Sequence, residues 1–290
     1  MAISRRSEAA QGATLIAPPF LYSLVVLAAP LLTILFYSFF LFKAGYGELN
    51  QGFTVENYRL IWTDPIFHAI MSRSLIVSGM VTAATVLLAF PVAYYVSFVV
   101  RPERKALWLF LITIPFWTSY LIRVFLWKVI MEQNGVINSV LVGLGLTDDP
   151  VTMLRTVGAI IMTLAHAYAP FAILPIFVAL EKIDRSLLEA GRDLGESRAM
   201  TFWRVTLPLA MPGVIAAVLI VFIPTVGDYV TPELIGGGRI PMIANFIQAQ
   251  MLGLDNRPLG SAMAVSAMLC VAVISVIFLF LNRRFLRVKQ

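Results

Sequence analysis

Long runs of apolar residues constrain this chain more than any other feature of its sequence. Each of six blocks is long enough to cross a bilayer, which takes about 20 residues of helix. They cover residues 14–42, 74–100, 106–131, 156–180, 206–228 and 260–282. Of the 290 residues, 59% are hydrophobic and only 13% charged, against about 25% charged in soluble domains. Because backbone polar groups in lipid must be satisfied within the segment, we expect an all-α, multi-pass membrane protein with six transmembrane helices.

The distribution of Lys and Arg predicts the orientation of these helices, since positively charged loops stay cytoplasmic. The N-terminal segment, the loop after the second block, the loop after the fourth and the C-terminal tail hold two, three, five and four of them, fourteen in all. The opposite loops hold four, namely Lys43, Arg59, Arg239 and Arg257. Both termini are therefore expected in the cytoplasm. The net charge of +6 then has a membrane explanation, whereas binding of nucleic acid would need basic residues concentrated on one soluble face.

The same pattern predicts the organisation of the chain. We expect residues 1–70 to form a cytoplasmic N-terminus, the first transmembrane helix and an outer loop. Residues 71–282 should form the membrane core, and residues 283–290 a cytoplasmic basic tail. Within the core, Pro241 can open a short helix that ends at Gly253, because proline suits a first helical turn. We expect this helix to pack against the spans on the outer face.

A densely charged segment, EAGRDLGESRAMTFWRVTLP at residues 189–208, interrupts the apolar sequence. It belongs to the longest loop on the cytoplasmic side, about residues 181–205, which we call the charged loop. Ser186 and Glu189 match the S-x-x-E capping box that starts a helix. Gly195 suits the left-handed residue that ends one, and Ser197 can cap a second short helix before the fifth span begins.

The charged loop should present apolar side chains to the cytoplasm, including those of Leu187, Leu188, Leu194, Met200, Phe202 and Trp203. Exposed apolar area of this kind indicates a protein partner. An amphipathic helix lying on the lipid surface, with its Arg side chains toward the headgroups, is the other interpretation. The residues of the charged loop alone do not decide between a protein partner and the lipid surface.

The residues of the charged loop resemble a known signature. Glu189, Ala190, Gly195 and the Val205 to Pro208 segment match E-A-A-x3-G-x9-I-x-L-P of the permease subunits of binding-protein-dependent ABC importers, with Gly191 for the second Ala and Val205 for Ile. The resemblance implies the type I ABC importer permease fold. It also implies that the loop is a coupling helix seated on the ATP-binding subunit. The residues then expected at that joint are Glu189, Ala190, Gly191, Gly195, Leu187, Leu188, Leu194, Met200 and Trp203.

Four further stretches resemble spermidine/putrescine permease subunits more narrowly: PFWTSYLIRVFLWK (115–128), GVIN (135–138), IDRSLLEAGRDLG (183–195) and PTVGDYVTPELIGGG (224–238). This implies polyamine import across a bacterial inner membrane. The implied partners are an ABC ATP-binding subunit dimer, a second permease subunit and a periplasmic substrate-binding protein. ATP and Mg would be bound by the partner subunits, and no cofactor by this chain. A permease for another small organic solute, and an ATP-independent carrier or channel, are the alternatives.

A polyamine in a dehydrated channel needs carboxylates and aromatic faces, since a cation over Trp or Tyr gains about 0.5 to 2 kcal/mol. The candidates are Asp228, Tyr229 and Glu233 at the outer end of the fifth block, and Trp117, Ser119 and Tyr120 along the third. Asp228 could instead be a loop residue or a partner of Arg239. The aromatic residues could instead form an interfacial belt.

The sequence contains no pattern that indicates catalysis or metal binding. His68 and His166 are the only histidines, and no cysteine partners them at a metal-ligand spacing. There is no GxxxxGK[ST] phosphate loop, so ATP hydrolysis is expected on a separate subunit and this chain is not expected to be an enzyme. His166 lies within the fourth block, where a hydrogen bond between helices is the favoured role.

Overall fold

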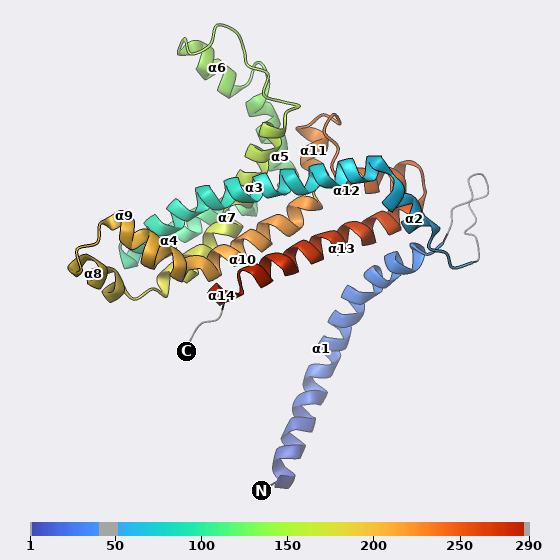
Figure 1. Ribbon diagram of the computed structural model, residues 1–290, viewed down its shortest axis with the longest axis horizontal. Helices are drawn as coiled ribbons and strands as arrows, with labels where there is room; N and C mark the ends of the chain where they lie inside the picture. Colours follow the sequence, from blue (N-terminus) through green and yellow to red (C-terminus); the bar gives the residue numbers. More distant parts are fainter. Residues whose placement is uncertain (1, 41–51, 287–290) are drawn as a thin grey trace. The chain divides into compact units, whose positions relative to one another are not determined.

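A computed structural model of the protein describes residues 2–40 and 52–286, with side chains from residue 12 onward. The described chain is helical, and these residues include no β-strand (Figure 1). Lys43, Arg287 and Lys289 of the predicted outer loop and basic tail lie outside the described residues. The chain divides into two compact units, which we describe separately.

The first unit comprises Met1–Asp64 and Ile247–Met268. Helix α1, Ala2–Tyr37, is followed by α2, Glu56–Thr63. The two are joined by the buried Asn57, whose Nδ2 donates to the carbonyl oxygens of Ser38 and Phe40 at 3.0 and 2.5 Å. Along α1 itself, none of the apolar window is buried. Its side chains are therefore available to lipid or to other helices.

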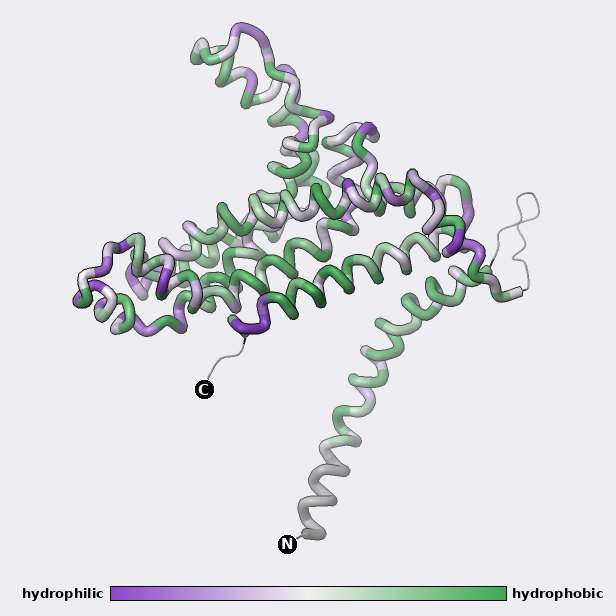
Figure 2. Tube along the Cα trace, viewed as in Figure 1, coloured by the Kyte–Doolittle hydropathy of each residue, from purple (hydrophilic) through white to green (hydrophobic). Residues whose placement is uncertain are grey.

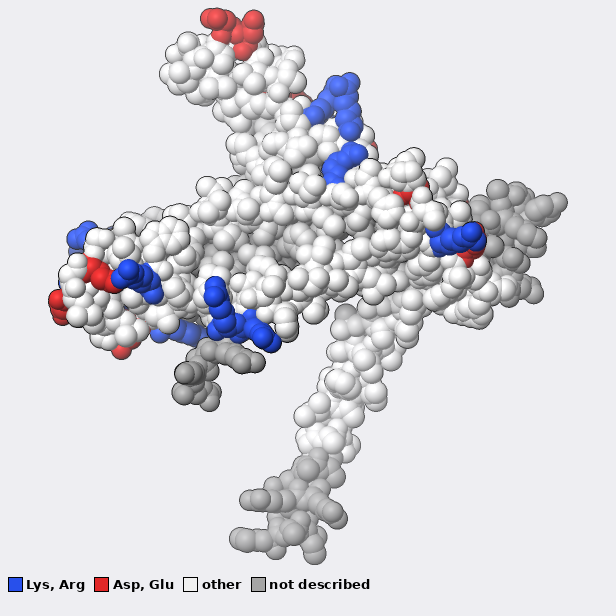
Figure 3. Space-filling view, viewed as in Figure 1, with Lys and Arg blue, Asp and Glu red and all other residues white. Residues whose placement is uncertain are grey.

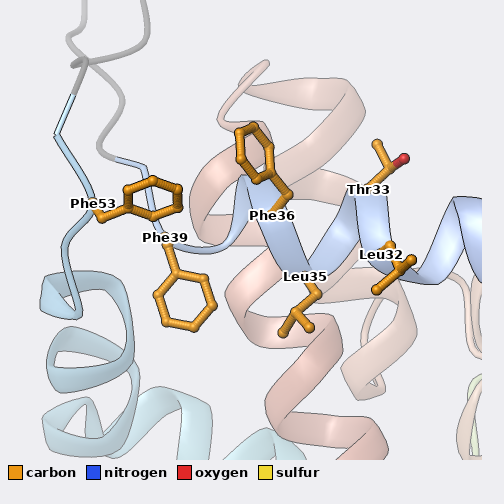
Figure 4. Close-up of a pocket in the computed structure, with 6 residues that line it drawn as sticks. All are labelled: Leu32, Thr33, Leu35, Phe36, Phe39 and Phe53. Atoms are coloured by element: carbon orange, nitrogen blue, oxygen red, sulfur yellow. The ribbon is translucent and has the colours of Figure 1, made fainter.

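An apolar hollow of about 540 Å³ lies where α1 ends, lined by Leu32, Thr33, Leu35, Phe36, Phe39 and Phe53 (Figure 4). The rings of Phe36 and Phe53 meet edge to face there, with centroids 5.7 Å apart. The same unit contains the end of α12, Ile243–Gln248, a π-helical turn, Ala249–Gly253, and the first half of α13, Arg257–Leu281. The helix predicted between residues 241 and 253 is thus confirmed, although it begins two residues later.

The second unit comprises Pro65–Phe246 and Leu269–Gln290. Its core is built by three helices that pack on one another: α3, Pro65–Phe98, α7, Val157–Glu181, and α10, Leu207–Val226. Small side chains recur where they meet, and Ala89, Ala93, Ala172, Ala210 and Ala217 are all buried. Small residues let helix backbones approach closely in a membrane. Helix α3 begins nine residues earlier than the predicted residue 74.

Gly213 marks a close approach of α10 to α7. A Cβ at this position would lie 2.5 Å from both Ala179 Cβ and the Pro175 carbonyl oxygen. We expect Gly213→Ala to lower the unfolding midpoint of the detergent-solubilised protein by several degrees, because overpacking costs about 1–3 kcal/mol. Gly79→Ala in α3 is the matched control, since a Cβ there meets nothing within 4 Å. Equal midpoints for the two variants would contradict this packing.

Five helices are long and apolar enough to cross a membrane in the part of the chain that the structure describes: Gly12–Tyr37, Pro65–Phe98, Val157–Glu181, Arg198–Val226 and Arg257–Leu281 (Figure 2). A sixth crossing is possible only if a bent helix pair, Pro102–Trp117 and Tyr120–Gly143, forms one span. The all-α, multi-pass fold predicted from the sequence is confirmed.

The third block is not the continuous helix that we predicted. Helix α4, Pro102–Thr113, runs into a 3-10 turn, Ile114–Trp117, and α5, Tyr120–Met131, follows after a bend of 87°. Pro115 explains the break, because proline lacks the N–H of the helical ladder and restricts the residue before it. Each 12-residue helix is about 18 Å long, too short to cross about 30 Å of hydrocarbon alone.

The fifth span also differs from the prediction, because it starts inside the charged loop. Helix α9, Arg198–Thr201, continues through a π-helical turn, Phe202–Thr206, directly into α10. In that turn the Leu207 N–H donates to the Phe202 carbonyl oxygen. Pro208 has no N–H to continue the ordinary ladder, and a π-bulge is a known way to accommodate such a change.

The charged side chains of the second unit gather away from the middle of the bundle. Lys, Arg, Asp and Glu cluster at the end that carries α8, Arg185–Asp193, and α9, and near α14, Arg283–Leu286 (Figure 3). Figure 3 also shows acidic side chains beside α6, Val136–Gly143, and basic side chains beside α11, Val230–Leu234, whereas the side chains along the helices between are largely uncharged on the face shown. An uncharged middle with charged segments beyond it is the arrangement that a bilayer imposes on a helical bundle.

Candidate functional site

The charged loop begins with a helix cap that differs from the prediction. Helix α8 starts after Asp184, whose Oδ1 accepts the N–H of Ser186 at 2.9 Å. Ser186 is therefore not the cap, because the carboxylate two residues earlier takes that role. This hydrogen bond from Ser186 lowers the pKa of the Asp184 carboxyl. Glu189 therefore does not belong to a capping box with Ser186, and its side chain is exposed.

The end of α8 agrees with the prediction. Gly195 has a φ of +83°, in the left-handed region. Its N–H donates to the Arg192 carbonyl at 2.9 Å, and the N–H of Glu196 donates to the Gly191 carbonyl at 3.0 Å. These two bonds are those of the Schellman motif. A Cβ at Gly195 would meet nothing within 4 Å, so glycine is needed here for its backbone conformation alone.

The loop folds back on itself as two packed helices. Ser197 caps α9 as predicted, accepting the Met200 N–H at 3.2 Å. Gly191 is buried, and a Cβ there would lie 3.3 Å from Cγ2 of Thr201, so the second Ala of the signature would fit only tightly. Arg204 and Glu196 form an ion pair at 3.0 Å. The result is a compact helix-turn-helix.

Most of the predicted apolar side chains face outward. Leu194 is 85% exposed and Trp203 64%, Leu187 and Met200 are also exposed, as is Ala190, and Leu188 is half-buried. Phe202 is a correction, because it faces inward. Its ring packs on Phe90 and Tyr94 of α3, with centroids 5.6 and 6.1 Å away, and so fixes the loop to the bundle.

A polar cluster that the sequence did not reveal joins three helices at the base of the charged loop. Lys105 of α4 pairs with Glu181 of α7 at 2.5 Å. Ser97 of α3 donates its hydroxyl to the same carboxylate at 2.7 Å, and the Lys105 ammonium also donates to the Ser97 carbonyl at 2.8 Å. Lys105 and Glu181 lie at the edges of apolar blocks. In the sequence they therefore look the same as ordinary charged loop residues.

At the other end of α10, Asp228 is buried, with 7% of its surface exposed. Its carboxylate accepts the N–H of Val230 at 3.2 Å and that of Thr231 at 3.3 Å, at the start of α11, Val230–Leu234. No Lys or Arg of the described residues pairs with it, so the suggested partnership with Arg239 is not formed. Burial raises the pKa of the Asp228 carboxyl, and the hydrogen bonds partly offset this.

Tyr120, Tyr168 and Thr231 interact with this carboxylate, and Arg123 adjoins Tyr120. Together with Asp228 we call these residues the buried polar cluster. The Tyr120 hydroxyl lies 2.7 Å from Oγ1 of Thr231. The ring of Tyr120 lies 5.9 Å from Cζ of Arg123. Tyr168 interacts electrostatically with both Asp228 and Arg123. Arg123, which the sequence placed at the edge of a block, is thus the functional candidate that sequence reasoning missed.

The other predicted pathway residues are not part of this cluster. Trp117, Ser119, Tyr229 and Glu233 are exposed, and Ser119 precedes α5 at the break in the third block. Non-helical backbone at membrane depth is tolerated where it is buried in protein or lines a water-filled cavity. Trp117 and Ser119 therefore remain candidates for a substrate pathway. They lie at the bend between α4 and α5, whereas the sequence placed them along a straight helix.

His166 has the role that we predicted for it. The indole N–H of Trp127 on α5 donates to Nδ1 of His166 on α7 at 3.1 Å, and the two rings meet with centroids 5.3 Å apart. This hydrogen bond joins the second half of the broken span to the central bundle. The role of His166 in this structure is therefore to hold two helices together.

The sequence profile of the family described as "Binding-protein-dependent transport system inner membrane component" matches residues 89–287. The match covers more than half of the chain, and the chain belongs to this family. It is a multi-pass inner-membrane permease component of an ABC importer.

Named relatives resemble the chain over most of its length. Spermidine/putrescine transport system permease protein PotB of Haemophilus influenzae is 36% identical over 230 residues, 79% of this chain and 80% of that protein. The protein of the same name from Escherichia coli is 35% identical over 227 residues, 78% of this chain and 82% of the relative. Inner membrane ABC transporter permease protein YdcU of Escherichia coli is 30% identical over 267 residues, 88% of this chain and 84% of the relative.

Solved structures support the fold. A chain of a bacterial alginate ABC transporter, crystallised with its alginate pentasaccharide-bound periplasmic protein, superimposes with a TM-score of 0.74 at 17% identity, over 98% of each chain. A chain of the MetNI methionine ABC transporter gives a TM-score of 0.51 at 19% identity, over 78% of this chain and 98% of the other. At these identities the likeness extends to the fold alone.

Proposed function

We propose that this permease carries polyamines of the spermidine and putrescine type, and that the charged loop couples the pathway to a separate ATPase. The charged loop carries the proposal. It presents exposed apolar side chains, Leu194 and Trp203 foremost, on a fixed helix-turn-helix. Exposed apolar area on an ordered scaffold favours a protein partner. The relatives named as spermidine/putrescine permeases support the choice of cargo.

Continuity of one helix supplies the mechanical link. The helix that starts at Arg198 inside the charged loop runs without interruption to Val226, over 29 residues, a length of about 43 Å. Asp228 follows its far end. A partner that moves the charged loop therefore moves the segment that holds the buried carboxylate. Phe202 packs on Phe90 of α3 and so transmits the same movement to that helix.

Under this proposal the surface of α8 seats in the ATP-binding subunit. Glu189, Ala190, Leu187 and Met200 are exposed and available for that contact. Gly191 and Gly195 serve the same joint by shaping the loop, through the close packing of Gly191 on Thr201 and the left-handed φ of Gly195. ATP and Mg are bound by the ATP-binding subunit dimer, a periplasmic substrate-binding protein delivers the cargo, and a second permease subunit completes the pathway.

The cargo assignment rests on the chemistry of the buried polar cluster. The Asp228 carboxylate accepts two backbone N–H groups, and the side chains of Tyr120 and Thr231 also interact with it. No Lys or Arg of the described residues pairs with it, so its charge is available to an ammonium group that takes the place of a hydroxyl. The adjoining Tyr120 offers an aromatic face and a hydroxyl, both favourable to an organic cation. An anion would be repelled by a buried carboxylate, and a neutral sugar could donate hydrogen bonds to it but would leave its charge unpaired.

The test is ATP hydrolysis by the reconstituted complex, assembled from the proteins that copurify with this chain. We expect putrescine or spermidine, presented with the binding protein, to stimulate hydrolysis several-fold. A neutral disaccharide and a dicarboxylate, as controls, should leave the rate unchanged. Stimulation by a neutral or anionic solute alone would replace the polyamine assignment with that of another organic solute, and solute flux without any ATPase would indicate an independent carrier.

A further inference from the structure

A partly buried ion pair ties the first half of the broken third span to the start of the charged loop. Lys105 of α4 pairs with Glu181, and the two side chains are 14% and 34% exposed. The Lys105 ammonium also donates to the Ser97 carbonyl oxygen at 2.8 Å, and the Arg185 guanidinium donates to the same oxygen at 3.5 Å. We call Ser97, Lys105, Glu181 and Arg185 the base cluster. It joins the ends of α3 and α7 to the first turns of α4 and α8.

Two charges of the base cluster stand at helix ends that do not favour them. Glu181 is the last residue of α7, where the helix dipole favours a cation, and Arg185 is the first residue of α8, where it favours an anion. The helices that carry these residues therefore do not explain their charges. Their partners do, because Glu181 binds Lys105 and Arg185 reaches a carbonyl oxygen at the end of α3, where the helix leaves such groups free.

Helix α4 depends on Lys105 for its attachment to the bundle. None of its 12 residues is buried. Its apolar contacts are made by side chains that stay partly exposed, those of Leu109 and Ile112 against the core and that of Trp108 against the ring of Tyr95. Close packing is what holds helices together in a membrane, so such contacts fix α4 less firmly than the central helices. Lys105 adds an ion pair and a hydrogen bond to them.

The position of α4 matters for the pathway because the chain continues from it through the break into α5. Tyr120 is the first residue of α5, and its hydroxyl lies 2.7 Å from Oγ1 of Thr231 in the buried polar cluster. The charged loop therefore reaches this cluster by two routes. One is α10, which leads to Asp228. The other is the base cluster, which leads through α4 to Tyr120.

We propose that Lys105 is a positioning residue for coupling, because by binding Glu181 it makes the first half of the broken span follow the charged loop. A movement of the loop then displaces α4 together with α10, and both sides of the buried polar cluster respond. Without the ion pair α10 alone follows the ATPase, so that ATP is hydrolysed without matching movement of cargo. This role rests on the proposed function, since it deepens the coupling assigned there to the charged loop.

The test is the number of spermidine molecules taken up per ATP hydrolysed by the complete complex in proteoliposomes. Lys105→Met removes the ammonium group and keeps an unbranched side chain. We expect it to lower this ratio at least threefold while ATP hydrolysis continues. Glu181→Gln should lower the ratio equally, and the double variant should be no worse than either single variant, because both remove the same ion pair. The ratio does not depend on the amount of complex, so a variant that assembles poorly still gives a result.

Arg104→Met is the matched control, because it removes the neighbouring cation of α4, which forms no ion pair within the part of the chain that the structure describes. Its ratio should equal that of the wild type, and Lys105→Arg, which keeps the cation, should also keep the ratio. An unchanged ratio in Lys105→Met, an equal loss in Arg104→Met, or additive losses in the double variant would each overturn the role of Lys105. A wild-type complex that takes up no spermidine would overturn the proposed function instead.

Discussion

Gly195→Val is expected to abolish ATP-driven uptake while the protein still inserts and assembles in the membrane. The φ of +83° is in a region that costs an L-residue about 1–2 kcal/mol, and a β-branched residue is a genuine outlier there. The valine would force the turn between α8 and α9 to rearrange and would displace the outward apolar side chains. We expect at least a tenfold loss of uptake, measured beside the amount of permease in the membrane.

Gly145→Val is the matched control for that variant. Gly145 also has a positive φ, +68°, and a Cβ there would also meet nothing within 4 Å. It follows α6, Val136–Gly143, on the side predicted to be outer. The backbone strain is therefore similar, but the coupling surface is untouched and uptake should change little. Equal losses in the two variants would mean that strain in any loop impairs this protein, and the coupling role of Gly195 would fail.

Asp228→Asn should raise the KM for a cationic cargo at least tenfold with little effect on the amount of assembled protein. The N–H groups of Val230 and Thr231 donate to different oxygens of the carboxylate. Asparagine has a single oxygen and keeps one of these two hydrogen bonds at the start of α11. What it loses is the charge. Removing one partner of a buried ion pair costs about 3–5 kcal/mol, which makes a tenfold change a lower bound.

Asp149→Asn is the control for this effect, because it removes an equal charge from an exposed position in the loop after α6. Its kinetics should match the wild type. If Asp228→Asn transports spermidine with an unchanged KM, the buried carboxylate is not a cation site. The cargo would then have to be recognised elsewhere in the assembly.

Local backbone signals were read correctly from the sequence where one residue type fits far better than its competitors. Gly195 is such a case, since only glycine adopts the left-handed turn without cost, and Ser197 is another. The N-cap of α8 was predicted wrongly because Asp184 and Ser186 are both residue types that cap helices well. The sequence alone does not say which of the two is used. The choice depends on which side chain the turn places within hydrogen-bonding distance of the free N–H groups.

Features that depend on packing could not be predicted. A hydropathy window adds up apolar residues and does not register the break at Pro115, so residues 106–131 looked like one helix. Phe202 and Trp203 are adjacent and both aromatic, yet only contact with α3 turns Phe202 inward. Arg123 looked like a charge at the boundary of a block, and its burial follows from α5 bending back against α7.

The most direct test of the account is the accessibility of Leu194, because the charged loop must be cytoplasmic and must be covered by the ATPase. Leu194→Cys in a Cys270→Ser background would be labelled with a membrane-impermeant maleimide, and Leu144→Cys, exposed on the opposite side, would serve as the reference. We expect no labelling of Leu194→Cys in intact cells, rapid labelling in inside-out vesicles stripped of the ATPase, and protection when the ATPase is restored. Labelling from outside the cell, or equal labelling with and without the ATPase, would contradict the account.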